Sequence, residues 1–373
     1  MSTESLAVCS PHYGYASDST SGGAVYEREL LLRLGKHRVN TTIVLPPGGK
    51  SLSAGGVTTR RMKNAGLFGV SNAVAFFWEM KQEYRTCPFQ IIRVHDARAP
   101  LIACELFRTL TKQLPAILHL HHLDGVADFH MPMLRRLTKA IDVVVVPSKF
   151  TAGQAADLLR INSERILIIP NGIDTSVYTP RDVSSVALDF LSGDREVLLF
   201  VGSLVPRKNL LFLCNVVGIL RKRRKGILLV IAGEGPLRGR LEQHLDQNLL
   251  LENVMLLGPV SEEMKIALYN RCTVFVSSSL LEGFGLAPAE AMACGKPVVL
   301  ARSSALVELA EEGRSGFLAS PTDEREFAER VEYLLENEKV RSETGQLARK
   351  TIIARFNWEQ TAAEVAAACW KVA

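Results

Sequence analysis

The sequence lacks the long apolar runs and the paired cysteines that mark two large classes of protein. Its longest apolar stretches, such as residues 73–78, fall far short of the ~20 residues that a membrane-spanning helix needs. The seven cysteines are odd in number and widely scattered, and none forms a Cys-x-x-Cys pair. This pattern indicates neither a disulfide framework nor a cysteine zinc site, and a reducing, cytoplasmic location fits it best. The first residues have neither a basic start nor a long apolar core, so we expect no secretory signal.

Two short motifs of other enzyme classes are also absent. No Gly-x-Gly-x-x-Gly follows the first apolar run, which argues against a dinucleotide-dependent dehydrogenase. No Asp-x-Asp motif, which would suit a metal-dependent enzyme, occurs anywhere in the chain.

Hydrophobic residues make up 47% of the 373 residues and charged residues 22%. This balance excludes a disordered or fibrous chain, and the length favours two domains over one.

The formal charge of +5 is unevenly distributed. Residues 1–180 contain 20 Lys and Arg against 14 Asp and Glu, a balance of +6, whereas residues 181–373 contain 24 against 25. A basic first half suits an anionic partner, whether a phosphate ligand, a phospholipid surface or a nucleic acid. Because the sequence contains no RNA- or DNA-binding motif, we expect no nucleic-acid partner.

Short apolar runs alternate with segments of helical period along the whole chain. Because continuous apolar strands separated by helices are buried on both faces, the pattern predicts parallel sheets in an α/β protein. A polar stretch at about residues 174–194 separates two such halves, each a doubly wound, Rossmann-like domain. The expected strands are 6–9, 42–45, 91–95, 116–121, 143–147, 166–169, 197–201, 228–232, 254–257, 274–277, 297–300 and 316–318. The expected helices include 25–34, 210–222, 237–250, 261–271, 285–293 and 304–311.

The sharpest motif is LLEGFGLAPAEAMACGKP, residues 280–297. Gly283 and Gly285 allow the backbone to approach a ligand closely, and the first amides of the helix that follows form an anion site. Glu282, in the turn, can accept hydrogen bonds from sugar hydroxyls, and Glu290, two helical turns later, can hold a ribose. Taken singly, an acid near a helix N-terminus is explained by the helix dipole. The complete motif favours ligand binding.

This segment resembles the signature of the retaining, nucleotide-sugar-dependent glycosyltransferases of the GT-B fold, family 4, also called glycosyltransferase group 1. That family has two glutamates separated by seven residues around Gly-Phe-Gly, followed by a small-residue helix and Gly-x-Pro-Val. The resemblance implies that Glu282 contacts the transferred sugar and that Glu290 holds the ribose. It also implies that the backbone of the turn touches that sugar or its phosphate, at Gly283, Phe284, Gly285 and Leu286.

A second motif, LLFVGSLVPRKN, is a strand followed by a loop that contains Arg207 and Lys208. A diphosphate leaving group gains charge as the glycosidic bond breaks, and two adjacent cations are suited to stabilise it. Gly202 ends the strand and is expected in the donor site. The family often has an arginine directly after this glycine and a glycine after the Arg-Lys pair, where this chain has Ser203 and Asn209.

Gly22 and Gly23 follow the first strand and open the first helix, and they resemble the family's N-terminal double-glycine loop. Their amides would face a phosphate, although paired glycines alone are usually turn chemistry. The segment AILHLHHLDG ends a strand with three histidines. His121 matches the family's strand-end histidine near the anomeric carbon, with His122 as the alternative. A metal held by His119 and His121, which share a strand face, is the rival interpretation, and few nearby acids or cysteines support it.

Asn171 and Gly172 lie where the first domain ends, and they either shape a hinge or form a plain turn. We expect an acceptor-side domain at 1–172, a donor domain at 173–355, and a C-terminal helix at 356–373 that returns to the first domain. Closure of the two domains would exclude water from the cleft between them.

One basic and aromatic stretch, residues 58–81, raises the question of membrane contact. Cations beside exposed aromatic rings suit an anionic lipid surface at the inner face of a membrane. The alternative is a polar loop that leads into a buried helix. The side chains concerned are Arg60, Arg61, Lys63, Leu67, Phe68, Phe76, Phe77 and Trp78.

Together these features predict a metal-independent hexosyltransferase whose co-substrate is a nucleoside diphosphate sugar, with no further cofactor. It would transfer the sugar, with retention, to a hydroxyl of a glycan, a lipid-linked or a small-molecule acceptor. Arg207, Lys208 and the Gly22–Gly23 loop would stabilise the diphosphate. Two alternatives are a sugar phosphorylase or sucrose-synthase-like enzyme of the same fold, and a non-catalytic nucleotide-sugar-binding scaffold.

Overall fold

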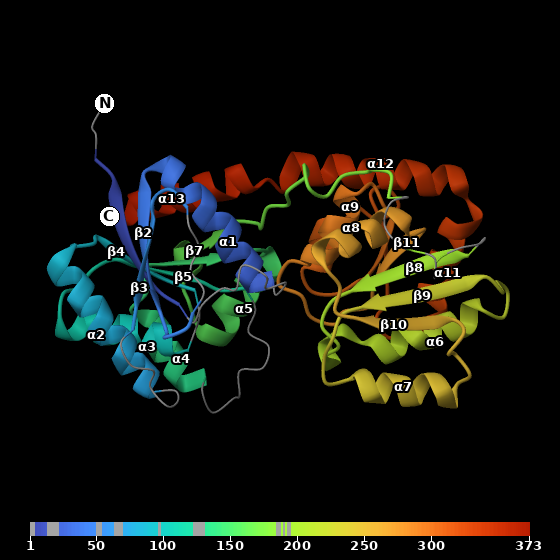
Figure 1. Ribbon diagram of the computed structural model, residues 1–373, viewed down its shortest axis with the longest axis horizontal. Helices are drawn as coiled ribbons and strands as arrows, with labels where there is room; N and C mark the ends of the chain where they lie inside the picture. The colour runs from blue at the N-terminus through green and yellow to red at the C-terminus, as the bar shows by residue number, and fades with distance from the viewer. Residues whose placement is uncertain are drawn as a thin grey trace. The chain divides into compact units, whose positions relative to one another are not determined.

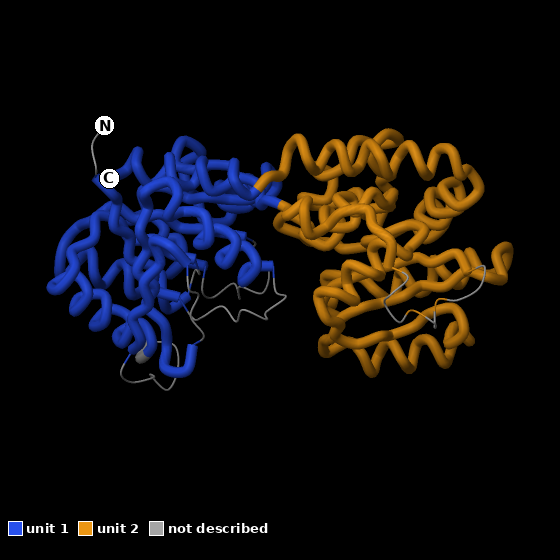
Figure 2. Tube along the Cα trace, turned by 45° about the horizontal axis from the view of Figure 1, so that its top comes forward, with its two compact units in different colours: residues 1–172, 358–373 blue, residues 173–357 orange. Residues whose placement is uncertain are grey.

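The computed structural model describes residues 4–12, 22–49, 54–62, 70–95, 98–121, 131–183, 188, 191 and 195–373. The chain divides into two compact units (Figure 2). Unit 1 contains Met1–Gly172 together with Trp358–Ala373, and unit 2 contains Ile173–Asn357. Each unit has its own parallel sheet covered by helices, so the predicted α/β class with two Rossmann-like domains is confirmed.

Unit 1 is built on a seven-stranded parallel sheet in the order β3-β2-β1-β4-β5-β6-β7. The strand order reverses between β1 and β4, and ligands of such sheets bind beyond the carboxyl ends of the strands at this point. The elements, labelled in Figure 1, are β1 (Leu6–Pro11), α1 (Gly22–Leu34), β2 (Val39–Leu45), β3 (Val57–Arg61), α2 (Val70–Thr86), β4 (Ile91–Val94), α3 (Ala99–Leu110), β5 (Ala116–His119), α4 (Met131–Lys139), β6 (Val143–Val146), α5 (Lys149–Leu159), β7 (Ile166–Ile168) and α13 (Trp358–Val372).

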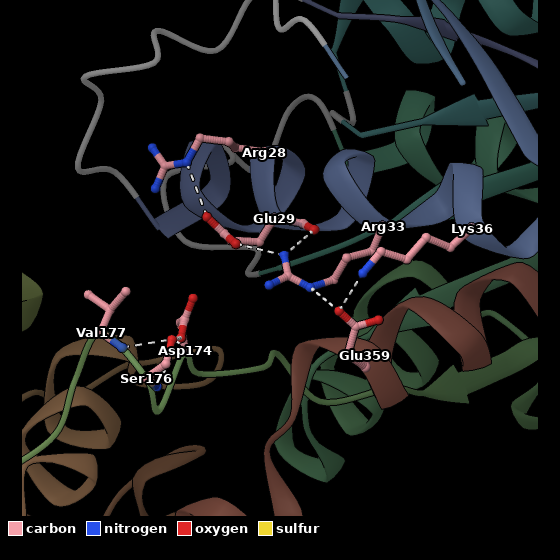
Figure 3. A network of polar contacts seen from close by, with 8 residues as sticks. All are labelled: Arg28, Glu29, Arg33, Lys36, Asp174, Ser176, Val177 and Glu359. Atoms are coloured by element: carbon pink, nitrogen blue, oxygen red, sulfur yellow. Dashed lines mark hydrogen bonds and ion pairs between the residues drawn. The ribbon is translucent and has the colours of Figure 1, made fainter. Parts of the chain in front are cut away.

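The C-terminal helix α13 packs on unit 1 beside α1. The Glu359 carboxylate accepts a hydrogen bond from Lys36 Nζ at 3.0 Å and forms an ion pair with Arg33, whose Nε lies 3.2 Å away (Figure 3). A Cβ atom at Gly172 would lie 2.4 Å from the backbone nitrogen of Trp358. Because only glycine permits this approach, Gly172 packs directly against the start of α13.

Unit 2 has a six-stranded parallel sheet in the order β10-β9-β8-β11-β12-β13, with the reversal between β8 and β11. Alternate residues of β8 face opposite sides: Val197 and Leu199 pack with α8, α9 and α12, whereas Leu198 and Phe200 pack with α6 and α11. The elements are β8 (Glu196–Val201), α6 (Leu210–Leu220), β9 (Ile227–Ala232), α7 (Arg238–Gln247), β10 (Val254–Gly258), α8 (Glu262–Arg271), β11 (Val274–Ser277), α9 (Leu286–Ala293), β12 (Val298–Ala301), α10 (Leu306–Leu309), β13 (Phe317–Ala319), α11 (Glu324–Glu336) and α12 (Glu338–Arg355).

Several predicted boundaries were wrong, among them the following three. The helix expected at 304–311 is only the four-residue α10, because Ser304 adopts a left-handed φ of +49° that a helix cannot include. The helix expected to reach residue 250 ends at Gln247, before the left-handed Leu249. The strand expected to reach residue 121 ends at His119.

The basic and aromatic stretch at residues 58–81 mostly follows the second interpretation, a polar segment that leads into a buried helix. Phe76 and Phe77, on α2, are buried in the core of unit 1, while Trp78 is half exposed. Arg60 pairs with Glu79 and Glu83 of the same helix, at 2.8 and 2.9 Å. Phe76 and Phe77 therefore cannot meet a lipid surface, which corrects that part of the prediction. Lys63, Leu67 and Phe68 lie outside the described residues. Within the described ranges no helix is both long and apolar enough to cross a bilayer.

Candidate active site

Three predicted residues of unit 2 form one charged cluster. Arg207 and Lys208 lie in a short 3-10 turn after β8, and Glu282 lies in the loop between β11 and α9. Arg207 Nη1 donates to Glu282 Oε2 at 3.1 Å, and Lys208 Nζ donates to Glu282 Oε1. Burial alone would raise the pKa of Glu282, but Lys208 and Arg207 outweigh it and lower this pKa below its ordinary value. The carboxylate of Glu282 therefore stays ionised between the two cationic side chains.

Backbone contacts hold the two loops of this cluster together. The N–H of Leu280 donates to the carbonyl of Arg207 at 2.7 Å, and Arg207 Nη1 donates to the carbonyl of Leu281 at 2.9 Å. The hydroxyl of Ser278 donates to the carbonyl of Lys208 at 2.9 Å. Because β8 and β11 are neighbours at the point where the strand order reverses, their following loops meet at the carboxyl edge of the sheet.

A third loop, between β12 and α10, holds Glu282 from the other side. The N–H of Glu282 donates to Ser304 Oγ at 2.9 Å, and the N–H of Ala305 donates to the carbonyl of Glu282 at 3.3 Å. Ser303 Oγ donates to the carbonyl of Ser279 at 2.6 Å. The sequence analysis missed these serines. Their only signal was a run of small polar residues directly after two predicted strands.

In the loop between β11 and α9, the glycine motif places backbone groups rather than side chains at the candidate site. Gly285 has φ +97° and directly precedes α9, whose first amides have no partner within the helix. The side chain of Phe284 is buried, with its ring 5.2 Å from that of Phe356. Gly202, with φ +155°, lies beside Lys208, since a Cβ atom there would be 3.7 Å from Lys208 Cε. Gly283 and Leu286, which flank this turn, are half-buried.

Glu290 has its own partners, separate from the Arg207 and Lys208 cluster. Tyr269 donates its hydroxyl to Glu290 Oε2 at 2.7 Å, and Lys265 Nζ lies 3.3 Å from the same oxygen. Lys265 also pairs with Glu262 at 3.1 Å. Burial raises the pKa of Glu290 in spite of these partners. Both partners were missed in the sequence, where Lys265 and Tyr269 belong to an ordinary helical pattern.

In unit 1, several histidines gather around Tyr26, which lies one turn after Gly22 and Gly23 open α1. The Tyr26 hydroxyl is 3.0 Å from Nδ1 of His119, and the ring of His121 meets the Tyr26 ring edge-on at 4.5 Å. His95, which follows β4, stacks on the Tyr26 ring at 5.6 Å. His122 lies outside the described residues. In the part of the chain that the structure describes, no three His, Cys, Asp or Glu side chains converge to hold a metal ion.

A fully buried ion pair lies next to these rings. Arg93 Nη1, on β4, donates to Glu27 Oε2 at 2.9 Å, and Nδ1 of His95 is 3.2 Å from the same oxygen. Burial alone would raise the pKa of Glu27, but Arg93 and His95 hold it far below its ordinary value. Burial lowers the pKa of His95 to about 4 and that of His119 well below its usual range. At neutral pH the two rings are therefore uncharged.

The chain matches two family models. Residues 189–351 match the glycosyl transferases group 1, and residues 20–177 match glycosyltransferase family 4. A D-inositol 3-phosphate glycosyltransferase of Paenarthrobacter aurescens is 33% identical over 205 residues, which is 54% of this chain and 50% of the relative. An uncharacterised glycosyltransferase of Methanocaldococcus jannaschii is 27% identical over 251 residues, 66% of each chain. These alignments span half to two thirds of the length of the curated relatives.

Solved structures share the whole fold at low sequence identity. Sucrose-phosphate synthase from Thermosynechococcus elongatus superposes with a TM-score of 0.84 at 19% identity, over 98% of both chains. Anabaena HepE, solved in complex with UDP and glucose, has a TM-score of 0.81 at 18% identity, over 97% of this chain and 98% of that one. With both halves matched by group 1 and family 4 models, the chain belongs to the group 1 glycosyltransferases of the GT-B fold.

Proposed function

We propose that this protein transfers a sugar from a nucleoside diphosphate sugar to an acceptor hydroxyl, with retention at the anomeric carbon and without a metal ion. The observation on which this rests is the cluster of Arg207, Lys208 and Glu282 in unit 2. In addition, HepE, which shares this fold, is solved with UDP and glucose. That ligand belongs to the relative, and it supports a nucleotide-sugar donor here.

The two cations supply the charge that this reaction requires. As the bond between the sugar and the diphosphate breaks, negative charge collects on the diphosphate, and fixed cations stabilise it more than they stabilise the ground state. Arg207 offers a planar fork of donors to phosphate oxygens, and Lys208 adds a compact charge. Because Arg207 and Lys208 face only the one carboxylate of Glu282 in this cluster, they are suited to attract the negative charge of the diphosphate.

Glu282 is suited to bind the sugar. Each of its carboxylate oxygens has two lone pairs and accepts from one of the two cations, which leaves acceptor capacity for sugar hydroxyls. Its lowered pKa keeps it an acceptor at neutral pH. Glu290, fixed by Tyr269 and Lys265, is assigned the ribose hydroxyls.

The unit 1 residues keep the roles that the family resemblance implies. His121, beside Tyr26, would bond a sugar hydroxyl, and the amides at Gly22 and Gly23 would contact phosphate. The acceptor is assigned to this unit.

The test is nucleoside diphosphate release by the purified protein across UDP-, GDP- and ADP-sugars, with and without a chelator. Glu282→Gln keeps the shape of the side chain but removes its charge, and we expect release to fall roughly 10- to 100-fold. Glu263→Gln, an exposed carboxylate on α8, is the matched control and should behave as wild type. Proton NMR of the product gives the anomeric configuration. If no donor is turned over or bound, the proposal is wrong. Formation of a sugar 1-phosphate from a glycoside and inorganic phosphate, without any nucleotide sugar, would indicate a phosphorylase instead.

A further inference from the structure

Two positions with a left-handed backbone lie beside the candidate donor site. Five non-glycine residues of the described chain have a left-handed φ, and they are Arg38, Arg160, Asn209, Leu249 and Ser304. Asn209 directly follows Lys208, and Ser304 contacts Glu282. Asparagine tolerates this conformation through its short polar side chain, whereas serine adopts it at a cost. Such strain persists only where surrounding contacts enforce it, and it is frequent at functional sites.

The contacts that enforce the strain at Ser304 all lead to the glutamate loop. The Ser304 hydroxyl accepts the N–H of Glu282 at 2.9 Å, and the next residue, Ala305, donates its N–H to the Glu282 carbonyl at 3.3 Å. Both backbone groups of Glu282 are thus held by two consecutive residues. The left-handed turn at Ser304 is what allows a side-chain acceptor and the next backbone donor to reach one peptide segment.

The carboxylate of Glu282 is held from the opposite side. Leu280 and Leu281 are hydrogen-bonded to Arg207, and both cations contact the Glu282 side chain. With the backbone fixed at one end and the carboxylate at the other, little conformational freedom is left to this glutamate. Preorganisation of this kind lowers the cost of reaching a productive geometry.

We propose that Ser304 is a positioning residue for sugar transfer, which fixes the Glu282 backbone so that its carboxylate meets both the cations and the donor sugar. This inference rests on the proposed function, in which Glu282 binds the sugar. A purely structural role for Ser304 is the competing explanation, and two substitutions at the same position separate them.

Ser304→Ala removes the hydroxyl and keeps the strained backbone, whereas Ser304→Gly removes both. Both variants lose the hydrogen bond to Glu282, so we expect both to release nucleoside diphosphate about fivefold more slowly at saturating donor. Because glycine adopts a positive φ freely, the melting temperature of Ser304→Gly should lie above that of Ser304→Ala. Leu249→Gly relieves the same kind of strain at an exposed loop, φ +54°, and is the matched control, with unchanged release.

Hydrogen–deuterium exchange of the peptide that contains the Glu282 amide gives a readout independent of activity. We expect faster exchange there in both Ser304 variants and wild-type exchange in Leu249→Gly. Unchanged exchange in both variants would overturn the inference. So would activity that follows melting temperature, with Ser304→Gly restored to the wild-type rate. If the wild-type protein turns over no donor, but exchange at the Glu282 amide still rises in the Ser304 variants, then Ser304 does hold the Glu282 backbone and the proposed function is wrong.

Discussion

The buried ion pair between Arg93 and Glu27 gives the sharpest test of the packing in unit 1. Neither side chain is exposed, and the two terminal nitrogens of Arg93, Nη1 and Nη2, donate to the two carboxylate oxygens of Glu27. Removal of one partner leaves an uncompensated charge in the core, which costs about 3–5 kcal/mol. For a unit of this size such a loss lowers the melting temperature by roughly 6–20 °C. We therefore expect Arg93→Met to destabilise unit 1 strongly.

The chain contains a selective reporter for this measurement. Its three tryptophans are Trp78, Trp358 and Trp370, and all three lie in unit 1. Tryptophan fluorescence during thermal or urea unfolding therefore follows unit 1, while circular dichroism follows both units. The expected result is a lower fluorescence midpoint in Arg93→Met, with the unit 2 component of the dichroism signal unchanged.

Two further variants make the result decisive. In the double variant Glu27→Leu with Arg93→Met, no unpaired charge remains, so the midpoint should recover well above that of Arg93→Met alone. Lys36→Gln breaks an exposed contact to Glu359 in the same unit and should shift the midpoint little. Equal midpoints for Arg93→Met and Lys36→Gln, or a double variant no better than the single one, would refute the reasoning.

Three other predictions concern pH, the second glutamate and the C-terminal helix. As pH falls from 6.5 to about 4, the unfolding midpoint of unit 1 measured by fluorescence should fall. Burial lowers the pKa of His95 to about 4, so in this pH range only the unfolded chain takes up the proton. Fluorescence melts at several pH values measure this, and a midpoint that does not change with pH would contradict it. Lys265→Met removes the cation beside Glu290, so the pKa of that carboxyl should rise further, and the nucleoside diphosphate that the protein releases should bind roughly tenfold more weakly at pH 7 in calorimetric titrations. Gly172→Val would place a side chain against the Trp358 backbone and detach α13, so limited proteolysis should remove that helix faster than in the wild type.

The order of the strands was predictable because a strand that is buried on both faces appears in the sequence as a continuous apolar run. The exception, β3, has the sequence VTTRR and was missed. It pairs with β2 alone at the edge of its sheet, so most of its residues remain exposed or half-exposed and need no apolar run. The short α10 was overestimated because a left-handed serine at its start leaves no trace in hydrophobic period.

The site was predictable only where a motif is local. Arg207, Lys208 and Glu282 lie in two recognisable segments. Ser304 and Tyr26, by contrast, act through partners 22 and 93 positions away in the chain. Strand order decides which residues become neighbours across such separations, and the sequence does not give strand order directly. In the linear sequence each of these side chains therefore looks like an ordinary loop or helix residue. Buried charges are the hardest to predict, because nothing in the sequence indicates that a glutamate and an arginine 66 positions apart form a buried ion pair.

The distribution of charge separates the two units more clearly than composition does. The first 180 residues hold the positive excess of the sequence, and yet at the centre of the unit 1 site the charged side chains of the described chain form the balanced pair Arg93 and Glu27 beside uncharged rings. Residues 181–373 are slightly acidic, but their candidate site places two cationic side chains, Arg207 and Lys208, against the carboxylate of Glu282. An anion responds to nearby, partly buried charges far more than to screened surface charges. Under the proposed function, the diphosphate would meet its fixed positive charge at Arg207 and Lys208 in unit 2, whereas the Gly22 and Gly23 amides and the uncharged rings of unit 1 would contribute hydrogen-bonding groups without net charge.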